Sequence, residues 1–138
     1  MNQIETYNEI LNGSSYLALA TSVEGRANVR VVNYYENPVI PGVLYIRTKK
    51  DKQKVAEFTA NPVVAFSTII KSKYEYIRVQ NAIIEQCTEP LSEEIKMAFI
   101  KREPNFVAKK DGTIFFAIHF QSASVTINPT SPSLTVKF

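Results

Sequence analysis

Residues 43–54 read VLYIRTKKDKQK, and this stretch decides the fold because it joins a strand to a helix through a basic turn. Its first half is β-branched, aromatic and aliphatic, which is typical of a β-strand. Residues 52–60 carry Val55 and Phe58 at helical spacing. Asp51 is the expected N-cap of that helix. The stretch therefore predicts a strand that leads through a basic turn into a helix.

The start of this helix is a candidate anion site. The first N–H groups of a helix have no partner within the helix, and the helix dipole is positive at this end. The hydroxyl of Thr48 and the ammonium group of Lys54 could close around a phosphate. A solvated basic turn is the alternative, because runs of charge usually lie on the surface of a protein.

Length and composition limit the class of protein. A chain of 138 residues fits a single domain over residues 1–138, with a core of its own. The hydrophobic fraction of 45% is typical of a globular protein. The net charge of +3 is too mild to demand a nucleic-acid partner, so any basic site must be a local cluster.

Cysteine content and hydropathy predict a cytoplasmic protein without a membrane span. Cys87 is the single cysteine, so no internal disulfide can form, which favours a reducing compartment. The first residues, MNQIE, lack the basic and apolar regions of a secretory signal. The longest apolar runs are too short to cross a bilayer. One cysteine and one histidine also argue against a structural zinc site.

The rest of the chain predicts a mainly β fold with short helices. Helices are expected at residues 2–12, 52–60 and 90–101. Strands are expected at residues 15–22, 28–35, 43–48, 63–70, 74–86 and 113–120, with residues 123–128 continuing or pairing with the last one. The tail from Pro129 onward carries only weak signals. These elements predict a six-stranded antiparallel barrel with helices at its ends, since closure removes exposed strand edges.

Four segments carry a resemblance to a known family. They are LALAT at residues 17–21, NVRVV at 28–32, YIRT at 45–48 with Lys54 six residues beyond it, and Asn61-Pro62 before an apolar strand. In this order they resemble the pyridoxamine 5′-phosphate oxidase-like family, whose members are FMN-binding split β-barrels of Greek-key type. The resemblance covers nearly the whole chain.

The resemblance implies a homodimer that binds FMN at the subunit interface. The residues implied to lie against the flavin are Arg30 and the backbone of Val31 and Val32. Those implied to hold the ribityl and phosphate groups are Arg47, Thr48, Gln53 and Lys54. Tyr76 matches a position from which a polar residue reaches the flavin from the partner side.

Each candidate has an alternative interpretation. Arg30 could be a charge on the barrel surface, and the tyrosines of the strands could serve packing or dimer contacts instead of a flavin. The pattern around His119 favours a core or interface histidine over a catalytic one. Cys87 is expected to be an inert small hydrophobe. No catalytic residue stands out in the sequence.

The resemblance implies an FMN-dependent oxidoreductase or flavin reductase-like enzyme of unassigned substrate. It departs from the true vitamin B6 oxidases, because residues 128–138 contain no Arg or His to grip a pyridoxamine phosphate. A non-catalytic module that binds or stores FMN is one alternative. A basic β-barrel that binds single-stranded nucleic acid through Arg30, Arg78 and interleaved tyrosines is another.

Overall fold

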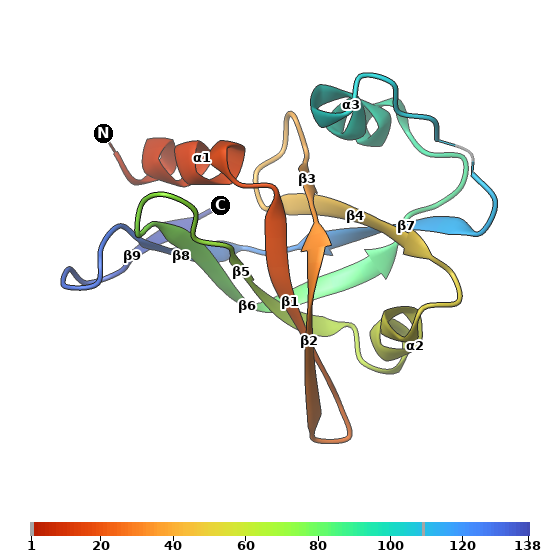
Figure 1. Cartoon of the computed structure of the whole chain (residues 1–138), viewed down its shortest axis with the longest axis horizontal. Helices are drawn as coiled ribbons and strands as arrows, with labels where there is room; N and C mark the ends of the chain where they lie inside the picture. The colour runs from red at the N-terminus through yellow and green to blue at the C-terminus, as the bar shows by residue number, and fades with distance from the viewer. Residues whose placement is uncertain (1, 109) are drawn as a thin grey trace.

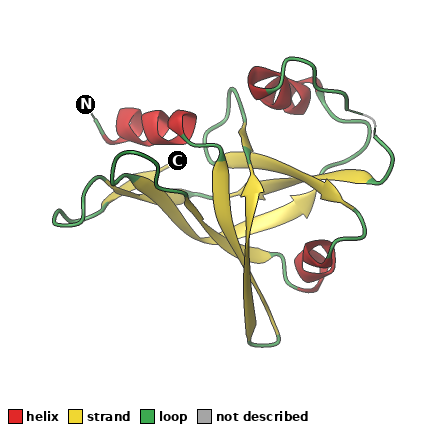
Figure 2. Cartoon of the chain, viewed as in Figure 1, coloured by secondary structure: helices red, strands yellow, loops and turns green. Residues whose placement is uncertain are grey.

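The computed structural model describes residues 2–108 and 110–138, and its strands form one nine-stranded antiparallel sheet. The helices are α1 (Gln3–Gly13), α2 (Gln53–Ala60) and α3 (Glu93–Arg102). The strands are β1 (Tyr16–Val23), β2 (Arg26–Asn33), β3 (Tyr35–Glu36), β4 (Val43–Lys49), β5 (Val63–Thr68), β6 (Tyr76–Gln86), β7 (Thr113–His119), β8 (Ser122–Thr126) and β9 (Leu134–Lys137). The curled sheet lies between the helices, as Figures 1 and 2 show.

The strand order confirms the split barrel that the sequence predicted. The sheet runs β2-β1-β5-β6-β7-β4-β3, with β8 paired to β6 and β9 paired to β8. The six predicted strands correspond to β1, β2, β4, β5, β6 and β7. The expected strand over residues 123–128 forms β8, which pairs with β6 and β9 and not with β7. The additional strands β3 and β9 are short, and the expected strand over residues 28–35 divides because β2 ends at Asn33. Tyr34 then turns into the core, where its hydroxyl donates to the carbonyl oxygen of Leu11.

Two apolar clusters fill the two sides of the sheet. The first lies inside the curl, where Phe58 of α2 packs edge-on against Phe116 of β7 with ring centroids 5.1 Å apart. The second lies beneath α3, where Phe99 stacks on Tyr35 at 4.2 Å. Fully burying each such side chain stabilises the fold by about 1.5–3 kcal/mol. Helix α2 is therefore anchored by its buried face, while its first turn remains at the surface.

The turn before β4 requires glycine. Gly42 has φ +82°, and a Cβ atom there would lie 2.4 Å from the carbonyl oxygen of Phe120. The carbonyl oxygen of Gly42 accepts a hydrogen bond from the N–H of Phe120 at 2.9 Å. This close approach sets the start of β4 against the end of β7, and β4 carries Arg47 and Thr48 toward α2 and α3.

The C-terminal tail forms a strand that the sequence signals did not identify. Strand β9 pairs with β8, and Val136 is buried. The ring of Phe138 packs against Tyr7 of α1 at 5.0 Å and against Phe120 at 5.6 Å. Tertiary packing therefore orders a segment of weak local propensity. Across the described part of the chain, no helix combines the length and apolar character that crossing a membrane demands.

Candidate cofactor site

Helix α2 begins without a side-chain cap. The expectation that Asp51 caps it is wrong, because the extended N-cap position, with φ −74° and ψ 146°, is held by Lys52. A lysine side chain has no acceptor atom and cannot satisfy the first N–H groups. The N-terminus of α2, directly after β4 and its basic turn, therefore keeps donors that an anion can use.

Lys54 adds a cation to the first turn of α2. Burial lowers the pKa of its ammonium group, and the positive charges of Arg30 and Lys52 lower it further. A bound anion would relieve this repulsion between cations. Lys54 on α2 therefore lies close enough to Arg30 on β2 for the two positive charges to repel each other.

Arg30 points inward from the edge strand β2 and is held by fixed partners. Its Nη1 donates to the carbonyl oxygen of Leu19 at 3.2 Å and to Oγ1 of Thr21 at 3.0 Å, and its Nη2 pairs with Glu57 of α2. The side chains of Arg30 and Glu57 are only 18% and 12% exposed. Arg30 is therefore a partly buried, compensated cation and not a free surface charge.

The carboxylate of Glu57 accepts hydrogen bonds from several polar side chains around it. Its Oε1 also accepts from Oγ1 of Thr21 at 2.6 Å, and its Oε2 accepts from Nδ2 of Asn28 at 3.1 Å and Nε2 of Gln53 at 2.8 Å. These hydrogen bonds, with those from Thr21 and Asn28 foremost, lower the pKa of Glu57 to about 2. We call Thr21, Asn28, Arg30, Gln53 and Glu57 the Glu57 network. It joins β1, β2 and α2.

A pocket lies beside this network. It has a volume of about 440 Å³ and opens between the β1–β2 hairpin and α2. Its polar lining includes Arg26, Asn28, Gln53 and Glu57. Glu57 was not among the predicted site residues, although its position one helical turn after Gln53 places both side chains on the same face of α2.

Strand alternation separates the other predicted residues. Val32 faces the core with Arg30, whereas Val31 is 61% exposed on the opposite, outer face of β2. Thr48 is buried on the inner face of β4, where its hydroxyl makes only a long contact of 3.5 Å to the carbonyl oxygen of Lys49. The neighbouring residue, Arg47, must therefore point to the other face of β4.

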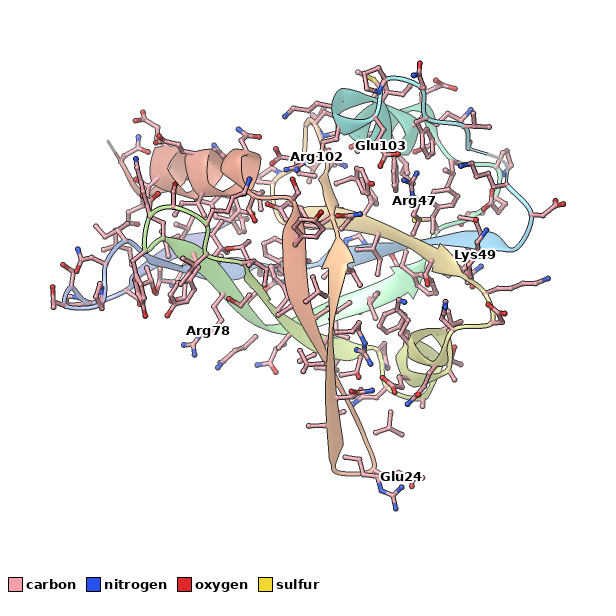
Figure 3. All side chains as sticks on the ribbon, viewed as in Figure 1. Glu24, Arg47, Lys49, Arg78, Arg102 and Glu103 are labelled. Carbon is pink, nitrogen blue, oxygen red and sulfur yellow. The ribbon has the colours of Figure 1, made fainter. Side chains whose placement is uncertain are left out.

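Arg47 contacts α3 and not the Glu57 network. Its Nη2 lies 2.6 and 2.7 Å from the two carboxylate oxygens of Glu103. Figure 3 shows both side chains beneath α3. Its guanidinium also lies 5.5 Å from the ring centroid of Tyr35 and 5.7 Å from that of Phe99. Arg47 thus links the C-terminal end of α3 to strand β4 of the sheet.

Tyr76 is the first residue of β6. It pairs with Thr126 of β8 and packs edge-on against Tyr74 at 6.0 Å. Strands β1 and β5 separate β6 from β2, so the structure does not bring Tyr76 to Arg30 within one protomer.

His119 is not a core residue. It lies on the outer face between Val43 and Ile83, with its side chain partly exposed, and its Nε2 lies 2.9 Å from Oε1 of Glu85. Cys87 is buried, and burial raises the pKa of its thiol to about 11, which suits an unreactive thiol. In the described residues, no three His, Cys, Asp or Glu side chains gather in a way that could hold a metal.

Solved structures share this fold at low sequence identity. General Stress Protein 26 from Bacillus anthracis str. Sterne has a TM-score of 0.75 and 18% identity, with 100% of both chains covered. HutZ, the heme storage protein from Vibrio cholerae, has a TM-score of 0.67 and 15% identity over 86% of this chain and 90% of that one. An F420 reductase has a TM-score of 0.61 and 21% identity over 81% of this chain and 90% of that one.

Sequence comparison identifies the family. No curated protein matches the chain. The family described as Pyridoxamine 5′-phosphate oxidase-like matches residues 10–132, which cover the end of α1, all of α2 and α3, and every strand of the sheet except β9. The chain therefore belongs to the pyridoxamine 5′-phosphate oxidase-like family.

Proposed function

We propose that this chain is a flavoprotein that binds FMN with its phosphate at the N-terminus of α2. The observation that carries the proposal is the uncapped first turn of α2, which follows β4 and contains Lys54. A phosphate monoester carries close to two negative charges near neutral pH and is best held by charged and N–H donors. The α2 N-terminus and Lys54 are donors of this kind.

The other residues of the proposed site orient and shield the cofactor. Thr48 lies one residue before the end of β4 and supplies a hydroxyl, and Gln53 is fixed by its hydrogen bond to Glu57. Arg30 and the backbone of Val31 and Val32 border the ring. Arg47 could reach the ribityl chain only by leaving Glu103. When bound, FMN supplies the hydride and electron transfer chemistry.

A second copy of the chain completes the proposed site. Val29 and Val31 on the edge strand β2 are 62% and 61% exposed, and Tyr16, Val63 and Ile83 extend this apolar surface across β1, β5 and β6. An apolar surface of this kind marks an interaction site, and most soluble homo-oligomers are twofold dimers. The dimer would bring Tyr76 of one protomer toward the flavin of the other.

The test of cofactor identity is the visible spectrum of the purified protein. We expect the two absorption bands of an oxidised flavin, and a released molecule with the mass of FMN. If the protein purifies colourless, the same spectrum is recorded during titration with FMN. A heme spectrum, or a protein that binds neither FMN nor riboflavin, would contradict the proposal.

We further propose that the protein is an enzyme in which the bound flavin is reduced by a nicotinamide donor. The alternative is an FMN carrier, and the two differ in reactivity toward a reductant. Anaerobic mixing with NADH or NADPH should bleach the flavin bands of the loaded protein faster than those of free FMN. Bleaching no faster than that of free FMN, with either nicotinamide, supports the carrier.

A further inference from the structure

We propose that Glu57 is a specificity-determining residue that weakens the attraction of the α2 site for phosphate by neutralising Arg30. The inference rests on the proposed FMN site and names the residue that sets its preference for phosphorylated flavin. Nothing in the sequence resemblance assigned a role to Glu57.

The geometry of Glu57 fixes its charge in place. Both carboxylate oxygens are occupied, Oε1 by Thr21 and Arg30, and Oε2 by Asn28 and Gln53. The donors come from β1, β2 and α2 itself, so the carboxylate cannot rotate away when an anion approaches. At physiological pH it remains ionised, because its pKa lies far below that range.

Glu57 also lies close to the cations that would attract a phosphate. It follows Lys54 by three residues on α2, and residues at this spacing are neighbours on a helix surface. Its direct partner is Arg30, whose charge it cancels. An anion at the first turn therefore meets Lys54 and the helix dipole, with Arg30 and Glu57 contributing almost no net charge.

An isosteric amide at position 57 removes the negative charge and leaves Arg30 uncompensated. The site then gains one positive charge, which attracts the phosphate of FMN and has little effect on riboflavin. We expect the affinity ratio of FMN over riboflavin to rise by about three- to tenfold in Glu57→Gln, the scale of one unit charge acting through a solvated site on a dianion. The salt dependence of FMN binding should also become steeper.

The experiment measures FMN and riboflavin binding by quenching of flavin fluorescence at low and moderate salt. Glu93→Gln is the matched control, because the side chain of Glu93 is 87% exposed on α3. This control should keep the wild-type ratio. A ratio in Glu57→Gln that equals or falls below the wild-type value would overturn the proposal.

A second pair of variants keeps the test decisive if Glu57→Gln does not fold. Arg30→Gln leaves Glu57 uncompensated and should lower the ratio, and Arg30→Gln combined with Glu57→Gln should raise it again. The double variant contains no unpaired charge at this position. Failure of the double variant to exceed Arg30→Gln would overturn the inference, whereas a wild-type protein that binds no flavin would overturn the proposed function instead.

Discussion

Arg30 of β2 and Glu57 of α2 form an ion pair whose side chains are 18% and 12% exposed, which makes it the most enclosed of the ion pairs in the described residues. The pair connects the edge strand of the sheet to the helix that begins the candidate site. Removing one partner of such a pair leaves an uncompensated charge, which costs more than an exposed pair contributes.

The first prediction concerns the stability of the protein in acid. The pKa of Glu57 is about 2 in the folded state, below its ordinary value of 4.5, so Glu57 contributes stability above pH 4.5 that is lost as the pH falls toward 2. The difference in unfolding free energy between wild type and Glu57→Gln should therefore shrink from pH 6 to pH 3. Urea titrations at both pH values measure it, and an unchanged difference would show that Glu57 is not held in its ionised form.

The second prediction concerns Lys54. Lys54→Ala should weaken FMN binding by about 1.5–3 kcal/mol, the contribution of a charged hydrogen bond, and should leave riboflavin binding unchanged. Lys50→Ala is the control, because Lys50 is an exposed residue of the same turn. Isothermal titration with both ligands measures the effect. Equal FMN affinity in Lys54→Ala and wild type would remove Lys54 from the site.

The third prediction separates the two roles open to Arg47. Its contacts with Glu103, Tyr35 and Phe99 predict that it secures α3. Arg47→Gln should therefore lower the unfolding free energy by about 1 kcal/mol or less, since the pair is about one-third exposed, and should leave FMN affinity within about twofold. Denaturant unfolding and flavin titration on one variant test both roles. Weakened FMN binding at unchanged stability would instead make Arg47 a flavin ligand.

The fourth prediction concerns the dimer. Val31→Asp places a charge on the exposed apolar surface of β2 and should shift sedimentation toward the monomer, because a buried unpaired carboxylate opposes association. FMN binding should weaken together with dimerisation. Val39→Asp is the control, since Val39 is 75% exposed in the loop before β4. A monomeric wild-type protein that binds FMN would remove the flavin from a subunit interface.

The predictable parts of this chain are those in which local pattern and tertiary structure agree. Alternation identified the six main strands, and helical spacing identified α1, α2 and α3. The Asp51 cap was wrong because β4 extends one residue further than the pattern indicated, to Lys49, and α2 begins one residue later, at Gln53. The tail strand β9 depends on pairing with β8 and on Phe138 meeting Tyr7, contacts that no local pattern contains.

The site was predictable only in part for a similar reason. The candidate anion site is local, so spacing alone placed Lys54 on the first turn of α2. The role of Glu57 depends on Arg30, which is 27 residues away, and on Thr21, which is 36 residues away. When it is not known which strand faces α2, the sequence predicts only that Glu57 is a solvated charge on the helix surface.

The last prediction concerns substrate. We expect that the FMN-loaded protein does not efficiently oxidise pyridoxamine or pyridoxine phosphate. Such a substrate carries a phosphate of its own and needs a second set of cationic donors over the flavin. The C-terminal residues that could supply them, 128–138, contain one basic residue, Lys137 of β9.

Two of the remaining basic residues, Lys101 and Arg102, are engaged elsewhere in the structure. Arg102 donates to the carbonyl oxygens of Ser14 at 2.7 Å and Leu11 at 3.0 Å, and Lys101 lies 3.3 Å from Glu36. Arg78 remains exposed on the outer face of β6. A site without paired donors for a dianion loses several kcal/mol of binding, which costs orders of magnitude in catalytic efficiency.

Hydrogen peroxide production with pyridoxine phosphate measures this activity, and an authentic pyridoxine phosphate oxidase serves as the positive control. We expect kcat/KM well below about 10⁴ M⁻¹s⁻¹, the lower end of ordinary enzyme efficiency. Turnover above that value would show that the chain holds the second phosphate elsewhere. Arg78→Ala would then test one donor, because Arg78 is an exposed cation that a partner subunit could bring to the flavin.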